Sequence, residues 1–424
     1  METSVTSGSL RDAALAAYER GDEDAPAQLA AALRSNATDG GLLIAEARAL
    51  SAAGDRGALV RLRAMLRAAP DWLDGHVALA QLRWEAGESG SFLDEFETAL
   101  RLLPGHSGLW LRYISTIASS GAWQRAADVA RSLRRRAGDR PALRLIEARH
   151  AGAAGDLARA GALLESLPDE FPEKRLEEAR HRLRLGDAPA ASRLLDRVRQ
   201  AAPPDASVWA LIELAWRATG DPRHSWLLDP EAFVKNVDLG LGEAALSRLA
   251  PVLQGMHHAT GQPLGQSVRQ GTQTRGNLWL RAEPEIGALG SRLRSAVAEF
   301  ATSLPKADPA HPLLADRDRA FDLVTGWSIR LGAGGRHVSH IHAHGVLSSA
   351  CYIVVPGMAA DEAGWLELGR PPPDFPLDLD PIALVEPRAG RLVLFPSYLY
   401  HGTRPFSEGE RLTVAFDAAP VPRR

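Results

Sequence analysis

One stretch decides the fold of the C-terminal half of this chain: Arg336-His337-Val338-Ser339-His340-Ile341-His342-Ala343-His344. The histidines at positions 340, 342 and 344 alternate, so on a β-strand their side chains would project from one face. A further histidine, His401, follows a second strand-like run, and Arg411 comes ten residues later. Two imidazoles from one strand and one from another can bind a single metal ion, and an arginine can bind a carboxylate held beside it. The pattern predicts a metal centre with His340, His342 and His401 as ligands.

Other segments near this centre also have the pattern of β-strands. Strand-like runs occur at 323–331, 349–355, 391–395 and 411–416, and a helical pattern over 286–304 precedes them. Because several short strands separated by turn residues are typical of a β-sandwich or barrel, we expect such a fold here. The segment 364–388 is rich in proline and aspartate, and we expect it to be mostly loop. Cys351 and Trp327 are interpreted as core residues.

Between the two halves of the chain lies a polar run: Gln266-Ser267-Val268-Arg269-Gln270-Gly271-Thr272-Gln273-Thr274-Arg275-Gly276-Asn277. This run is too polar to form part of a hydrophobic core. Two interpretations are open, a loop on the substrate side of the predicted centre and a plain linker.

The first half of the chain repeats. A glycine that marks a turn between helices recurs at Gly21, Gly54, Gly87, Gly121, Gly155, Gly186 and Gly220. The steps are 33, 33, 34, 34, 31 and 34 residues, and segments rich in alanine and leucine flank each glycine. A period near 34 with helix–turn–helix units resembles the tetratricopeptide repeat, whose neighbouring units stack into a superhelix. The resemblance covers residues 8–222. It leaves two roles open, a groove that binds a peptide or protein and a scaffold or dimerisation module.

Composition and charge narrow the classes of function. The 424 residues give room for two or three domains, and a formal net charge of −3 gives no general electrostatic reason to bind nucleic acid or an anionic membrane. A single cysteine excludes an intramolecular disulfide framework and thiolate zinc sites. Neither a signal peptide nor an apolar stretch long enough to span a bilayer is visible, so a cytoplasmic location is expected. The sequence favours no particular oligomeric state.

The segment from about residue 325 to residue 417 resembles a family of 2-oxoglutarate- and Fe(II)-dependent oxygenases. The family pattern has a His-x-His motif, a strand that begins Ser-Gly or Ser-Ser and ends in tyrosine, a Gly-Arg-Leu-x-Leu-Phe-Pro-Ser stretch followed by histidine, and an Arg-x-Ser/Thr strand. The corresponding pieces here are His340-Ile341-His342, Leu347-Ser348-Ser349-Ala350-Cys351-Tyr352, Ala389-Gly390-Arg391-Leu392-Val393-Leu394-Phe395-Pro396-Ser397, His401 and Arg411-Leu412-Thr413-Val414-Ala415-Phe416. Their order, spacing and residue types agree with the family.

This resemblance implies the fold and the cofactors. The C-terminal domain would be a double-stranded β-helix (jelly roll), and the chain an α + β multidomain protein with a helical repeat superhelix over 8–222 and the oxygenase domain over 223–424. Fe(II) would be the metal, 2-oxoglutarate the co-substrate and ascorbate a further candidate cofactor, with no catalytic side chain beyond the metal ligands. Arg411 would bind the far carboxylate of 2-oxoglutarate through its bidentate fork. Thr413 on the same strand face, and Tyr352 on the neighbouring strand, could add hydroxyl bonds.

Position 342 departs from the pattern of most of this superfamily, which has aspartate or glutamate there. Three neutral imidazoles would then hold the metal, and 2-oxoglutarate alone would balance its charge. The alternative is that His342 lies outside the ligand set and that His337, His344 or a carboxylate such as Glu367 completes it. Because imidazole does not select iron strongly, zinc or another metal is a further alternative.

The combined pattern predicts a dioxygenase that hydroxylates a C–H bond and converts 2-oxoglutarate to succinate. Because a repeat array usually binds peptide, the expected substrate is a side chain of a peptide or protein recruited by the repeats. Two rivals stay open, a hydroxylase of a small molecule whose repeats serve assembly, and a non-catalytic repeat adaptor with a vestigial metal site. Activity that survives deletion of residues 1–222 would favour the first rival, and a purified protein without metal would favour the second.

Overall fold

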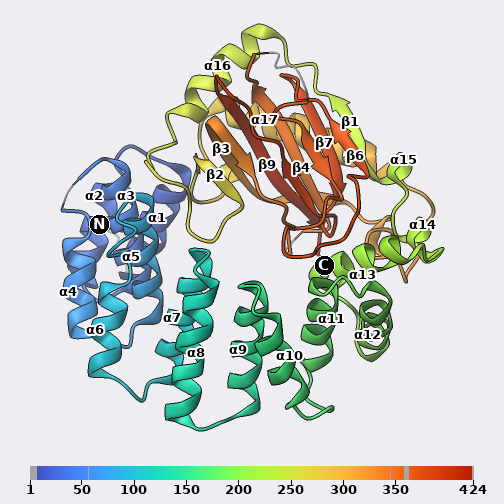
Figure 1. The fold of residues 1–424 in the computed structure, drawn as a ribbon. Coiled ribbons are helices and arrows are strands. Elements are labelled where there is room, and N and C mark those ends of the chain that lie inside the picture. Colours follow the sequence, from blue (N-terminus) through green and yellow to red (C-terminus); the bar gives the residue numbers. More distant parts are fainter. Residues whose placement is uncertain (1–6, 56, 344, 358–361, 423–424) are drawn as a thin grey trace.

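A computed structural model describes residues 7–55, 57–343, 345–357 and 362–422. Figure 1 shows two parts, an arc of paired helices and a β-sheet domain that sits on the inner side of this arc. The helices of the arc are α1 (Ser7–Arg20), α2 (Ala25–Ser35), α3 (Gly40–Ala52), α4 (Val60–Ala68), α5 (Leu73–Glu85), α6 (Asp94–Leu102), α7 (Ser107–Ser119), α8 (Trp123–Ala137), α9 (Pro141–Ala153), α10 (Leu157–Glu165), α11 (Lys174–Arg184), α12 (Ala188–Ala201) and α13 (Ala206–Thr219).

The glycine turns hold the repeat together. All seven glycines of the repeat pattern have positive φ, between 64° and 86°. Glycine is favoured there because a residue just past a helix must enter the left-handed region to cap the last carbonyl groups. The residue after the glycine then donates its N–H back to the preceding turn, as Asp156 does to Ala151 O at 2.9 Å. The helical repeat is therefore confirmed.

The rest of the chain forms the sheet domain and the helices that cover it. Its helical elements are α14 (Arg223–Leu227), α15 (Pro230–Phe233), α16 (Glu243–Gln254), the 3₁₀ turns η1 (Leu278–Leu280) and η2 (Leu314–Asp316), and α17 (Pro284–Ser303). Its strands are β1 (Lys235–Asp238), β2 (Val268–Gln273), β3 (Phe321–His337), β4 (Leu347–Val354), β5 (Leu366–Leu368), β6 (Ala383–Val385), β7 (Arg391–Pro396), β8 (His401–Thr403) and β9 (Arg411–Pro420). No described helix combines the length and apolar character that crossing a bilayer requires.

The strands form two antiparallel sheets with a cavity between them. The larger sheet has the order β1-β7-β4-β9-β3-β2, and the smaller has the order β6-β5-β8. The four predicted strand runs correspond to β3, β4, β7 and β9, and the predicted helix corresponds to α17, so this part of the fold is confirmed. The segment 364–388 is mostly loop, but it also contains β5 and β6, which the prediction missed.

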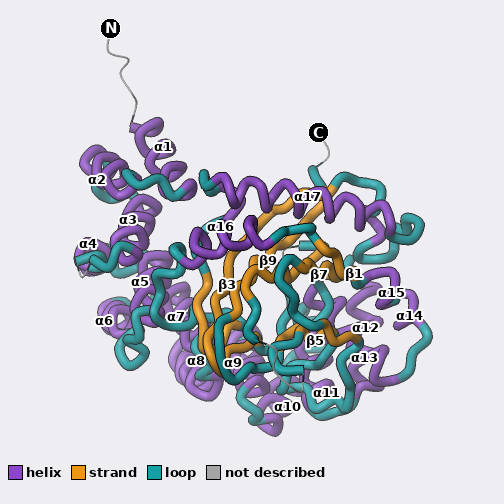
Figure 2. Tube along the Cα trace, turned by 90° about the horizontal axis from the view of Figure 1, so that it is seen from above, coloured by secondary structure: helices purple, strands orange, loops and turns teal. Residues whose placement is uncertain are grey.

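Strand β9 shows how the sequence divides the large sheet into two faces. Its even-numbered residues pack in the core with α17, and they are Leu412, Val414, Phe416 and Ala418. Its odd-numbered residues line the cavity, and they are Arg411, Thr413, Ala415 and Asp417. Figure 2 shows α16 and α17 lying along the covered side of this sheet. Cys351 is fully buried in the same core, as predicted.

The first repeats dock onto one side of the sheet domain. Gly261 N donates to Glu85 O at 2.8 Å, and Ala282 N donates to Arg20 O at 3.3 Å. Leu264, only 8% exposed, enters the hydrophobic cluster that helices α5 to α8 form. These contacts fix the first half of the arc against the edge of the sheet that β2 forms.

The last repeats share a hydrophobic cluster with the sheet domain. Trp209 and Trp216 of α13 pack in one cluster with Phe375 and Tyr398, and Tyr398 donates its hydroxyl hydrogen to Leu227 O at 2.6 Å. Two ties come from the helices α11 and α13, in which Arg184 pairs with Asp374 at 3.0 Å and Arg217 donates to the carbonyl groups of Gly369 and Asp380. The predicted boundary at residues 222 and 223 lies between α13 and α14, within this shared region.

Candidate metal centre

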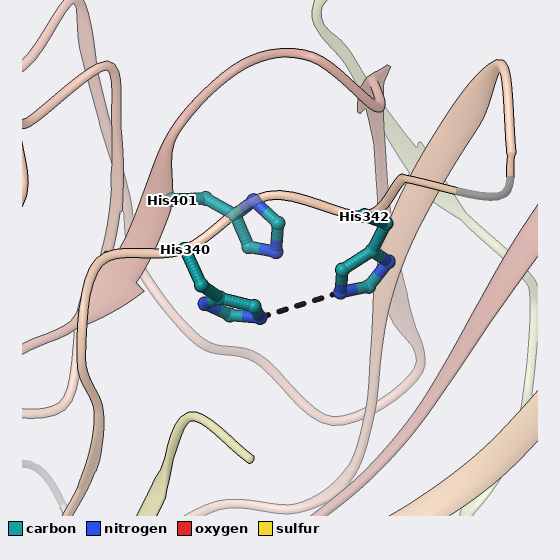
Figure 3. Close-up of side chains that lie close together, drawn as sticks. All are labelled: His340, His342 and His401. Carbon is teal, nitrogen blue, oxygen red and sulfur yellow. Dashed lines mark hydrogen bonds between the residues drawn. The ribbon is translucent and has the colours of Figure 1, made fainter. Parts of the chain in front are cut away.

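The histidines predicted as ligands lie together at one side of the cavity. Strand β3 ends at His337, so His340 and His342 lie on the extended segment after it and not on the regular strand that the sequence predicted. The alternation still holds because this segment pairs with the small sheet. His340 and His401 exchange backbone hydrogen bonds of 2.9 and 3.0 Å, and His342 N donates to Ser397 O at 3.2 Å. Figure 3 shows the three rings facing a common space.

Each of the three imidazoles has its Nδ1 atom held by an oxygen acceptor. Nδ1 of His340 bonds Val338 O at 2.9 Å, and Nδ1 of His401 bonds Leu399 O at 3.0 Å. Nδ1 of His342 bonds the Asp417 carboxylate at 2.6 Å. Because these oxygens only accept, each Nδ1 must carry the proton, which leaves a lone pair on each Nε2. The tautomers required for metal binding through Nε2 are thus fixed by the protein itself.

The ligand atoms are close enough to share one ion. One nitrogen from each of His340, His342 and His401 lies within 4.8 Å of the others, and the Nε2 atoms of His340 and His342 are 3.3 Å apart. Burial is the main cause that lowers the pKa of His340, to about 3, and it also places the pKa of His401 well below its usual range. The neighbouring imidazoles act in the same direction. Both rings are therefore neutral at pH 7, as metal ligands must be.

The other candidate ligands are placed differently. Glu367 bonds Arg370 at 2.9 Å and Arg404 at 3.0 Å, so two cations already neutralise its carboxylate. His337 stacks on His340 with ring centres 5.8 Å apart, and its Nδ1 bonds Ser267 Oγ at 2.9 Å. Among the described residues, neither side chain is part of the triad. His344 lies outside the described residues.

Asp417 is a part of the site that the sequence analysis missed. Its side chain is 4% exposed as a residue, and it bonds His342, Ser348 Oγ at 3.2 Å and Thr325 Oγ1 at 3.5 Å. The missed signal is the alternation along β9, since Asp417 continues the cavity face of Arg411 and Thr413. The carboxylate that most of the superfamily has as a ligand is absent here, but Asp417 brings a negative charge to the centre through His342.

Changing Asp417 to asparagine should test this positioning role. We expect the affinity for Fe(II) to fall roughly 10- to 100-fold, because the isosteric amide keeps the shape and removes the charge. Chelator-competition titration would measure the affinity, and the electronic spectrum of a Co(II)-substituted site would report a changed ligand field. Asp322→Asn is the matched control, because that carboxylate is half exposed and pairs with Arg294 on the outer surface. An unchanged affinity and spectrum in D417N would mean that Asp417 only supports the local fold.

Arg411 is a buried cation without an acidic partner. It is 1% exposed, and it donates to Gly364 O at 2.6 Å and to Thr403 Oγ1 at 2.8 Å. Its Nε atom has no hydrogen-bond partner among the described residues, and burial lowers the pKa of the guanidinium. A buried charge with an unused donor is costly unless an anion completes the site.

Two further predicted residues lie beside this cation. Tyr352 on β4 pairs in register with Thr413 on β9, and both line the cavity. The Tyr352 hydroxyl is buried and has no partner among the described residues, while burial raises its pKa to about 12. Unused donors on Arg411 and Tyr352 fit a carboxylate, and three bare imidazole nitrogens fit a divalent metal. The residues present therefore fit both 2-oxoglutarate and Fe(II).

The cavity continues outward from the histidines toward the repeat array. Its volume is about 660 Å³, and its lining includes Ser267, Gln273 and Arg275 of the polar run. The substrate-side interpretation of that run is thus favoured over a plain linker. Trp327 was predicted to be core, but it is only half buried, and it lines this cavity with its ring centre 5.3 Å from that of His342.

Comparison with known proteins agrees with the chemistry of these residues. Residues 325–417 match the family model described as "Putative 2OG-Fe(II) oxygenase", and this segment includes all six predicted site residues. The comparison with curated proteins gives no match.

Three solved structures represent the matches to parts of the chain. HygX from Streptomyces hygroscopicus, with nickel and 2-oxoglutarate bound, is 14% identical with a TM-score of 0.32, over 45% of this chain and 85% of that one. A tetratricopeptide repeat protein from Parabacteroides merdae is 18% identical with a TM-score of 0.35, over 52% and 89%. A Pseudomonas putida prolyl-4-hydroxylase is 16% identical with a TM-score of 0.31, over 46% and 99%.

Proposed function

We propose that this protein is a 2-oxoglutarate- and Fe(II)-dependent dioxygenase that hydroxylates a side chain of a peptide or protein. One observation carries the proposal. Three imidazoles with preset tautomers share a cavity with Arg411, a buried guanidinium whose Nε has no partner among the described residues. A vestigial site in a repeat adaptor would have no reason to keep a buried cation that lacks an anion, because such a charge destabilises the fold.

The protein's own residues divide the work of binding. His340, His342 and His401 would hold the metal, and Asp417 would orient His342 and keep its Nδ1 protonated. Arg411 would bind the far carboxylate of 2-oxoglutarate, with hydroxyl donation from Tyr352 and Thr413. When bound, Fe(II) and 2-oxoglutarate would together supply the oxidant for a C–H bond. Ascorbate remains a prediction from the family resemblance.

The peptide or protein substrate is supported by the place at which the cavity opens. Its lining includes Arg48, Gln81 and Glu85, which lie on repeat helices α3 and α5. A substrate that reaches the histidines by this route would touch the repeats as well as the sheets. Removing residues 1–222 would not separate this reading from a small-molecule hydroxylase, because the deletion also removes Trp209 and Trp216 from the shared cluster.

The direct test is an anaerobic titration of metal-free protein with Fe(II) and then with 2-oxoglutarate. We expect a metal-to-ligand charge-transfer band in the visible range, because the keto acid would chelate iron beside the three imidazoles. Succinate formation on admission of oxygen would then establish the oxidative decarboxylation. Iron binding without a band would remove 2-oxoglutarate from the mechanism, and binding of zinc in preference to iron would favour another metal.

A further inference from the structure

The outer part of the cavity is a polar site built jointly by the repeats and the sheet domain. Arg48 on α3, Gln81 and Glu85 on α5, and Arg275 after β2 line the same cavity as the predicted metal ligands. A volume of about 660 Å³ is in the range of pockets that bind whole ligands, and it exceeds what a five-carbon diacid requires. The remaining space leads from the metal centre to these four side chains.

The charges at this outer site do not cancel. Arg275 pairs with the nearly buried Glu85, so those two charges neutralise each other. Arg48 has no carboxylate within ion-pair distance in the part of the chain that the structure describes. Its Nη2 instead donates a long bond of 3.5 Å to Gln81 Oε1. One cation is therefore left over at the mouth of the cavity.

The surroundings of Tyr18 on α1 give a second view of the same positive charge. Burial raises the pKa of its hydroxyl, while Arg48, Arg275 and Arg281 all act to lower it. Three guanidinium groups therefore lie near one phenol. Arg281 pairs with Glu283, as Arg275 does with Glu85, and Arg48 is again the cation without an acidic partner among the described residues.

We propose that Arg48, positioned by Gln81, binds a carboxylate of the substrate, so that the enzyme selects substrates with an acidic group. This inference rests on the proposed function for the identity of the reaction, but not for the anion site itself. The co-substrate does not account for Arg48, because its far carboxylate has its own buried partner in Arg411 among the strands. Arginine suits this role because its planar fork can donate two parallel bonds to one carboxylate.

Both an acidic side chain of a peptide and a small carboxylic acid have the required chemistry. Binding would be measured by fluorescence anisotropy on the full chain without added metal. The probes are short labelled peptides that contain either aspartate and glutamate or their amides, asparagine and glutamine. Unlabelled aliphatic mono- and dicarboxylic acids and their amides serve as competitors. The variants are Arg48→Gln, the charge reversal Arg48→Glu, and Arg67→Gln on the exposed face of α4 as the control.

Acidic peptides should bind wild type and R67Q more tightly than the amide peptides do. R48Q should weaken that binding by about 10- to 100-fold, as expected for loss of a charge-assisted bond. R48E should reverse the preference toward peptides that contain lysine. Displacement by small acids, lost in R48Q, would assign the anion to a small molecule and still support the inference.

Equal binding of the acidic and amide sets, or binding that R48Q leaves unchanged, would overturn the inference. The charge-transfer band of wild type and R67Q is recorded on the same preparations. A band without Arg48-dependent binding means that the oxygenase proposal stands and the acidic substrate is wrong. Arg48-dependent binding without a band means the opposite.

Discussion

Replacing Arg411 with methionine is expected to weaken 2-oxoglutarate binding by about 10²- to 10³-fold, because a buried charge pair typically loses 2–5 kcal/mol when one partner is removed. The loss should be specific to the co-substrate. Fe(II) binding should persist, because the three histidines are intact. The metal-free variant should keep most of its stability, since the change also removes a buried charge that has no acidic partner among the described residues.

Three measurements on Arg411→Met check this expectation. The charge-transfer band gives the affinity for 2-oxoglutarate, chelator competition gives the affinity for Fe(II), and thermal unfolding gives the stability. Arg388→Met is the matched control, because its side chain is 64% exposed and lies outside the cavity. Arg411→Lys should recover only part of the affinity, since an ammonium cannot reproduce the fork. Normal 2-oxoglutarate affinity in R411M would exclude Arg411 as the anchor.

Changing His401 to alanine is expected to lower the affinity for Fe(II) by more than about 100-fold, which exceeds the usual effect of an outer residue such as Asp417. His401 is 6% exposed, and its Nδ1 is fixed by Leu399 O, so no small movement of another group can replace its Nε2. Succinate formation should fall to background at any practical Fe(II) concentration. His342→Ala should behave similarly if the triad consists of three imidazoles.

Isothermal titration with Fe(II) under argon would measure both variants. His106→Asn is the control, because His106 caps α7 in the repeats and asparagine can still accept the bond from Leu109 N. If H342A bound Fe(II) normally while H401A did not, the third ligand would have to come from another group in the cavity.

The sequence predicted those parts of the fold that depend on local spacing. Glycines such as Gly54 and Gly121 recur because each turn needs a positive φ, and their period alone identifies the repeat. Two histidines separated by one residue reach the same side of an extended chain whether or not it is a regular strand. This is why the triad could be placed in sequence although β3 ends at His337.

The parts that the sequence did not predict depend on contacts between distant segments. Asp417 follows the strand period of Arg411, but its role appears only when β9 lies beside the segment that carries His342. The position of Arg48 at the cavity depends on how the repeat arc curves around the sheets, and no local pattern encodes that curvature. Strands β5 and β6 are three residues long and lie among prolines, so they give almost no periodic signal.

The arc of helices is tied to the sheet domain near both of its ends, through Arg20 and Glu85 on one side and Arg184 and Arg217 on the other. A free repeat solenoid bends like a spring, because each unit contacts only its neighbours. Clamped in this way, it has lost that compliance and acts as a rigid frame. Gly369, which accepts from Arg217, donates its own N–H to Tyr400 O, one residue before His401. Mechanical strain on the frame would therefore be transmitted to the metal centre.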